Sequence, residues 1–72
     1  MTEIQSIIFY KKYYTLELAK SFLKEHKINP IEEVEIKDKY YRFRLIKPNI
    51  KIYNYEIKSI SSGIRLIFQH KR

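Results

Sequence analysis

The chain contains one helical pattern, and each apolar run after it has the two-residue spacing of a strand. Residues 15–27, TLELAKSFLKEHK, carry one stripe at helical spacing, made of Leu16, Ala19, Phe22, Leu23 and His26. Thr15 is a suitable N-cap, and Pro30 disfavours the α conformation at the residue before it, so we expect the helix to end there. Four strand-like runs follow, at 32–37, 40–47, 52–58 and 63–69.

A further strand is expected before the helix, because residues 4–14, IQSIIFYKKYY, are mostly β-branched or aromatic. The order is then β-α-β-β-β-β. This order predicts an α+β fold in which one helix packs on a mainly antiparallel sheet of four to five strands. The only glycine, Gly63, ends the segment SSG at 61–63, where we expect a turn with a positive φ angle. We expect residues 1–72 to form a single small domain.

Alternation divides the strand-like runs into two faces. In YYRFRLIKP, residues 40–48, Phe43 lies between Arg42 and Arg44. We expect the helix to cover the more apolar set, which is Tyr41, Phe43, Leu45, Tyr53, Tyr55, Ile57, Ile64, Leu66 and Phe68. The opposite face should then carry Tyr40, Arg42, Arg44, Lys58, Arg65 and Gln69, with Ile46, Ile52 and Ile67 among them.

The net charge of +7 is concentrated in the C-terminal half. From Lys39 to Arg72, nine Lys or Arg stand against Glu56 alone, whereas the first 38 residues carry six basic and seven acidic residues. A basic surface attracts polyanions, and arginines beside a tyrosine on a sheet can contact phosphates and stack on bases. The sequence therefore predicts a nucleic-acid-binding site of low sequence specificity, with DNA favoured over RNA, formed by Tyr40, Arg42, Arg44, Lys58 and Arg65.

A second explanation of the same residues stays open. Ile, Lys, Tyr and Asn are abundant, as an AT-rich genome produces without functional pressure, and an antiparallel sheet normally has a polar open face. The basic residues would then serve solubility alone.

No pattern indicates catalysis or a bound metal. His26 and His70 form neither a helical i, i+4 pair nor a cluster with carboxylates placed beside them. Glu33 and Glu35 share one side of their run, and a solvated strand face explains them better than acid–base chemistry. The SSG segment is too short for a phosphate-binding loop. We therefore expect a non-enzymatic protein with no cofactor, no metal and no small-molecule substrate.

The small size of the chain predicts a partner subunit. A core built from 72 residues is thin, and the sequence has no Cys for a disulfide. A two-fold dimer would bury the isoleucines outside the core, namely Ile46, Ile52 and Ile67 on the open face and Ile4 and Ile8 near a possible sheet edge. We therefore expect a homodimer. Because no apolar run approaches about 18 residues and the N-terminus lacks the charge order of a signal peptide, we also expect a soluble, intracellular protein without a membrane partner.

Three segments resemble a small domain of bacteriophage head-associated proteins and of proteins of large DNA viruses. They are FLKEHK (22–27), YYRFRLIKP (40–48) and GIRLIF (63–68), and the resemblance covers nearly the whole chain. Lys27 departs from the pattern, because phage copies often have Gly there. The resemblance implies a viral protein associated with the virion or the genome, located in the host cytoplasm or nucleus or packaged in the virion. It supplies no site residues.

Two hypotheses follow. The first is a viral nucleic-acid-binding domain that contacts phosphates through its basic sheet face. The alternative is a protein-interaction module of a viral structural assembly, which uses the same face or an edge strand.

Overall fold

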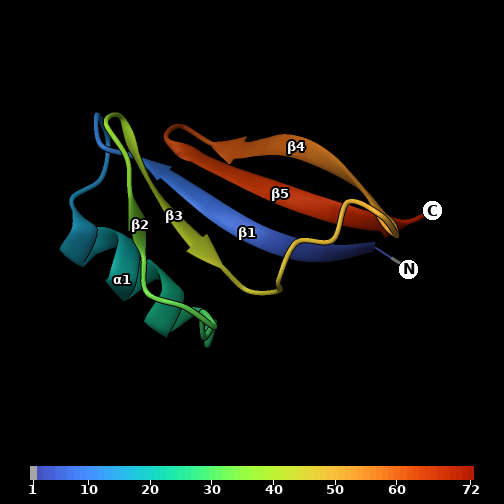
Figure 1. The fold of residues 1–72 in the computed structure, drawn as a ribbon. Helices are drawn as coiled ribbons and strands as arrows, with labels where there is room; N and C mark the ends of the chain where they lie inside the picture. The colour runs from blue at the N-terminus through green and yellow to red at the C-terminus, as the bar shows by residue number, and fades with distance from the viewer. Residues whose placement is uncertain (1) are drawn as a thin grey trace.

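The computed structural model describes residues 2–72, and its central strand is β1 (Thr2–Tyr10). The other elements are α1 (Leu16–Glu25), β2 (Glu35–Ile36), β3 (Tyr40–Arg44), β4 (Tyr53–Ser61) and β5 (Ile64–Lys71). The strands form one sheet in the order β2-β3-β1-β5-β4, in which all neighbours are antiparallel. The α+β class and the order expected from the sequence are confirmed (Figure 1).

Three strands are shorter than the sequence predicts. β3 ends at Arg44 although 40–47 was expected, so Ile46 lies in the loop after β3, and Ile52 lies in the same loop before β4 and not on the open face of the sheet. β1 stops at Tyr10 because the chain turns there, and the Tyr10 carbonyl accepts hydrogen bonds from the amides of Tyr13 and Tyr14, both at 3.0 Å. β2 is reduced to two residues, although 32–37 was expected to be extended. The Ile31 amide already donates to the Arg44 carbonyl, while Glu35 pairs with Arg42. From 31 to 35 this segment advances four residues, while β3 advances only two between Arg44 and Arg42. Residues 32–34 must therefore curve away from β3.

Helix α1 begins and ends with side-chain and backbone caps. The Thr15 hydroxyl accepts a hydrogen bond from the Leu18 amide at 3.2 Å, which confirms the expected N-cap. At the other end, the Ile28 amide donates to the Leu23 carbonyl and the Lys27 amide donates to the Lys24 carbonyl. This pair of bonds is a Schellman motif, and it requires a left-handed residue, which here is Lys27 at φ 56°.

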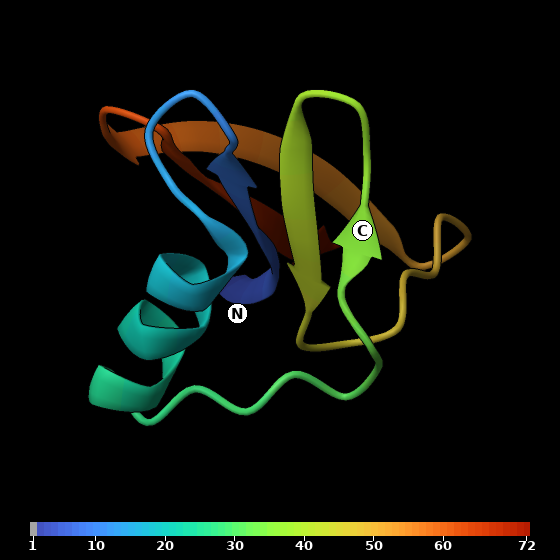
Figure 2. The same ribbon diagram turned by 90° about the vertical axis from the view of Figure 1, so that its left-hand side faces the viewer.

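The core lies between α1 and the part of the sheet formed by β1, β3 and the start of β5. Phe9 is at its centre and makes edge-to-face contacts with Tyr14, Phe22 and Phe43, at centroid separations of 5.2 to 5.6 Å. The other buried members of the cluster are Ile7, Ala19, Leu23 and Ile64. Figures 1 and 2 show α1 against this part of the sheet, whereas the β4–β5 hairpin continues past it.

The hairpin turns at Gly63, which has the expected positive φ angle of 83°. Ser61 pairs with Ile64, but the next pair is Ser59 with Arg65, so Ile60 is an extra residue in β4. Because side chains alternate with a period of two, this extra residue places every side chain of β4 before Ile60 on the face opposite to the one that a regular hairpin would give.

This bulge makes part of the predicted face assignment wrong. Tyr53, Tyr55 and Ile57 pair with Lys71, Gln69 and Ile67, and therefore lie on the face away from the helix. Lys58 pairs with Leu66 and lies on the helix side. The remaining predicted helix-side residues share the face of the core, since Phe43 and Leu66 both pair with the core residue Ile7.

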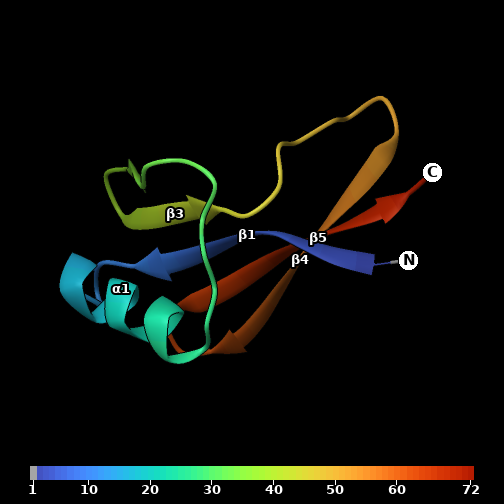
Figure 3. The ribbon, with the colours of Figure 1, turned by 90° about the horizontal axis from the view of Figure 1, so that it is seen from below.

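A second bulge, at Gln5, holds the loop that follows β3. The Gln5 carbonyl accepts from the Leu45 amide at 2.8 Å, and the Gln5 side-chain amide donates to the Ile46 carbonyl at 2.6 Å. Figure 3 shows the loop leaving β3 and reaching β4 at the end of the sheet where the termini lie. At that end the Tyr55 hydroxyl accepts from the Asn49 amide at 2.6 Å, and the sheet residues Ser6 and Gln69 are fully buried.

The sequence also placed Ile4 and Ile8 near a possible sheet edge, and this was wrong. Both belong to β1, the middle strand of five. Ile4 packs against the core, and Ile8 is buried. Neither is available for a subunit contact. The edges of the sheet are β2 and β4 instead.

Candidate nucleic-acid interface

The face of the sheet opposite α1 gathers side chains from three strands. Arg42 of β3 and Arg65 of β5 both pair with Ile8 of β1, so they lie on either side of that residue. Tyr40 pairs with Tyr10, and Arg44 pairs with Ser6. Four of the five residues predicted for the site are therefore brought together. Lys58 is not among them, because the bulge at Ile60 places it on the other face.

Two arginines of this face lie over tyrosine rings. The guanidinium carbon of Arg65 lies 5.1 Å from the centre of the Tyr10 ring, and that of Arg42 lies 5.8 Å from the Tyr40 ring. The two rings meet edge to face at 5.9 Å. We call the set of Tyr10, Tyr40, Arg42, Arg44 and Arg65 the arginine–tyrosine face. Its members are all partly accessible to solvent.

Tyr10 was missed by the sequence analysis. Its run, 4–14, was expected to be one strand, and its two sides were not assigned. The alternation of Ser6, Ile8 and Tyr10 against Ile7 and Phe9 could have identified it, because the second pair is the more consistently apolar.

Glu35 of β2 occupies part of the arginine–tyrosine face. Its carboxylate lies 2.9 Å from Nη2 of Arg44 and 3.8 Å from Nη1 of Arg42. From the sequence, Glu35 was expected on a solvated acidic strand face, and these ion pairs were not predicted. Each of the three side chains is about one quarter exposed, so solvent screens the pairs and their contribution to stability is small. Their larger consequence is electrostatic, since one carboxylate offsets part of the charge of two arginines.

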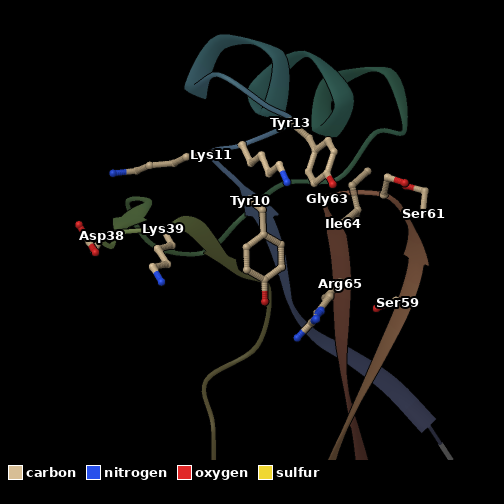
Figure 4. A pocket seen from close by; sticks show the side chains of 12 residues that line it. Tyr10, Lys11, Tyr13, Asp38, Lys39, Ser59, Ser61, Gly63, Ile64 and Arg65 are labelled. Carbon is tan, nitrogen blue, oxygen red and sulfur yellow. The ribbon is translucent and has the colours of Figure 1, made fainter.

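A hollow of about 600 Å³ continues from this face at one end of the sheet. It lies among the turns at 11–13, 38–39 and 61–63, and it is lined by four cations and one acid, namely Lys11, Lys12, Lys39, Arg65 and Asp38. Figure 4 shows the Tyr10 ring and the Arg65 side chain next to each other at its border, with Ser59 beside Arg65 and Ser61 near Gly63. The lysines of the hollow were not predicted, because the three turns are distant in sequence.

The histidines have structural neighbours. The His26 ring stacks on Phe22 with centroids 4.2 Å apart, and its Nδ1 donates to the Phe22 carbonyl. The His70 ring lies between the Thr2 hydroxyl and the Glu56 carboxylate, at 3.0 Å from each. Within residues 2–72, no group of three or more His, Cys, Asp or Glu side chains could hold a metal ion.

No family model, curated protein or solved structure matches the chain. The resemblance to viral domains therefore stays a prediction. Over residues 2–72, no helix has both the length and the apolar character needed to cross a membrane. A function has to be inferred from the geometry of the arginine–tyrosine face and of the hollow beside it.

Proposed function

We propose that this protein is a non-enzymatic nucleic-acid-binding domain of low sequence specificity, which contacts phosphates through its arginine–tyrosine face and favours DNA over RNA. The proposed viral setting depends on the resemblance of segments 22–27, 40–48 and 63–68 described above. The main observation behind the binding proposal is that three arginines and two tyrosines lie together on the sheet face that α1 leaves open.

The chemistry of these side chains fits a nucleic-acid backbone. A guanidinium group presents a planar fork of donors that matches two phosphate oxygens, and it keeps its charge at any physiological pH. A tyrosine ring offers a stacking surface that accepts any base. Contacts to phosphate and to base faces carry little sequence information, which supports low specificity. The lysines of the adjoining hollow extend the positive surface beyond the sheet.

The ion pairs of Glu35 supply a sharp test. The carboxylate competes with phosphate for Arg42 and Arg44, so Glu35→Gln should tighten the binding of a polyanion. In contrast, Arg42→Ala combined with Arg44→Ala should weaken binding and reduce the slope of log affinity against log salt by roughly one unit per lost phosphate contact. Fluorescence anisotropy with labelled single- and double-stranded DNA and RNA at several salt concentrations measures both effects.

Lys20→Ala is the matched control. It removes one positive charge, as Arg44→Ala does, but from an exposed position of α1, on the opposite side of the sheet. We expect a clear loss of affinity for Arg44→Ala and little change for Lys20→Ala. Equal losses would show that binding follows the net charge of the chain, and the arginine–tyrosine face would then be the wrong site.

The alternative function, a protein-interaction module, is favoured by a different observation. Ile57 of β4 is 59% exposed on the same face as the arginines, and Ile52 in the preceding loop is 44% exposed. Exposed aliphatic side chains on a strand are suited to an apolar protein contact. Such a contact would not weaken steeply with salt, so the same titration separates the two functions.

A further inference from the structure

Strand β4 is a long edge of the sheet, and its outer backbone N–H and C=O groups can pair with another strand. It has nine residues, and within residues 2–72 it pairs with β5 alone. The opposite edge, β2, has only two residues. Natural sheets usually protect a long edge with proline, repeated lysines, a bulge or a covering segment. The β4 sequence, YNYEIKSIS, contains no proline and a single lysine, and its one bulge, at Ile60, lies beside the turn, so residues 53–59 form a regular edge.

The charges of β4 complement each other in one particular arrangement. Glu56 and Lys58 flank Ile57, and both lie on the helix side of the sheet, where α1 does not cover the hairpin. If a second copy of β4 pairs antiparallel about a two-fold axis at Ile57, Glu56 lies opposite the partner's Lys58. By symmetry, Lys58 lies opposite the partner's Glu56. Two oppositely charged cross-strand pairs form, and no like charges meet.

The other face is also complementary in this register. Ile57 lies opposite the partner's Ile57, and Ile67 is the neighbour of Ile57 on β5. Four isoleucine side chains therefore form one row across the two copies. This row would bury Ile57, which is 59% exposed in the single chain. Of the isoleucines that the sequence predicted in a dimer contact, Ile67 belongs to this row.

We propose that two copies of this chain associate through β4, antiparallel and centred on Ile57, to form a continuous ten-stranded sheet. The two-fold axis is normal to the sheet, so both arginine–tyrosine faces lie on the same side of it. The isologous contact closes on itself, which limits the assembly to a dimer. This inference does not depend on the proposed nucleic-acid site, and its test needs no ligand.

Charge reversal at the two flanking residues tests the register. Glu56→Lys places lysines opposite each other twice, and Lys58→Glu does the same with carboxylates. Each single variant should raise the dimer dissociation constant roughly tenfold or more, measured by sedimentation equilibrium at micromolar concentrations. Lys58→Glu also lowers the net charge from +7 to +5, so long-range repulsion alone would predict the opposite result for it.

The double variant and the mixture complete the experiment. Glu56→Lys combined with Lys58→Glu restores both opposite-charge pairs and the original net charge, so it should dimerise like the parent chain. It also loses the Glu56–His70 contact and the approach of Lys58 to the Phe68 ring, and it therefore controls for those losses. Mixing the two single variants should yield a heterodimer. A parent chain that stays monomeric, or a dimer indifferent to the single reversals, would overturn the proposal.

Discussion

Strands β3 and β4, which lie toward opposite ends of the strand order, have similar sequences but different surroundings. In β3, the alternation of aromatic and basic residues places Phe43 in the core with 3% of its surface exposed. In β4, a comparable alternation places Tyr55 and Ile57 on the open side and Glu56 and Lys58 on the other, and no residue of the strand is buried. The helix covers the first end and leaves the hairpin uncovered (Figure 1). An alternating strand therefore becomes core or surface according to what packs on it.

This difference should appear in the distribution of stability. The covered end has the packed aromatic side chains around Phe9. In contrast, β4 is held chiefly by its pairing with β5, and β5 in turn pairs with β1. Apolar burial is the dominant favourable term in folding. Substitutions of equal size should thus cost far more in β3 than in β4.

The largest expected effect is that of Phe43→Ala. Removing a buried phenylalanine typically costs about 3–5 kcal/mol, which is comparable to the whole stability of a domain of this size. Arg44→Ala, one residue further along the same strand, should cost under about 1 kcal/mol, and so should Ile57→Ala in the monomeric chain, where Ile57 is exposed. Urea unfolding followed by circular dichroism, at protein concentrations below the dimer dissociation constant, measures all three. Equal costs for Phe43→Ala and Ile57→Ala would remove the distinction between the two ends.

The sequence predicted the covered end well and the hairpin only in part. In 40–44, buried and exposed residues differ sharply in polarity, so the faces could be assigned without knowing the partners. In 53–61, both sets are mixed, and the orientation depends on one extra residue, Ile60. A bulge has no reliable local signature in an isolated sequence, because it is defined by pairing with another strand.

The candidate site shows the same limit. Arg42, Arg44 and Arg65 could be grouped from alternation alone, since each lies in a strand whose faces were assigned correctly. Glu35 could not be recognised as their ion-pair partner, because the sequence does not reveal which strands are neighbours. The lysines of the hollow belong to separate turns that meet only in the folded chain.

The next largest effect is expected at Gly63, where the hairpin turn meets the segment that leads into the helix. A Cβ atom there would lie 2.6 Å from Cβ of Tyr13, and φ is 83°. The left-handed backbone alone costs a non-glycine residue about 1–2 kcal/mol, and the overlap with Tyr13 adds to it. Gly63→Ala should therefore destabilise the chain by about 2 kcal/mol or more in thermal unfolding, while Ser62→Ala should change the stability by less than about 0.5 kcal/mol. A cost for Gly63→Ala as small as that of its neighbour would mean that the hairpin turn does not pack on Tyr13.

The smallest predicted effect is a gain, and it concerns only the covered end. Lys27 holds the left-handed position of the Schellman motif after α1, which glycine occupies with less strain. Lys27→Gly should raise the free energy of unfolding by about 0.5–1 kcal/mol, or the melting temperature by several degrees.

Lys24→Gly removes the same charge from within the last helical turn, where glycine is unfavourable, and should lower the stability by about 1 kcal/mol. Native-state hydrogen exchange locates these changes. If α1 stabilises mainly the covered end, amides of β1 and β3 should gain protection in Lys27→Gly, while those at the far end of the β4–β5 hairpin should exchange as before. Equal gains throughout the sheet would show that its two ends unfold as one cooperative unit.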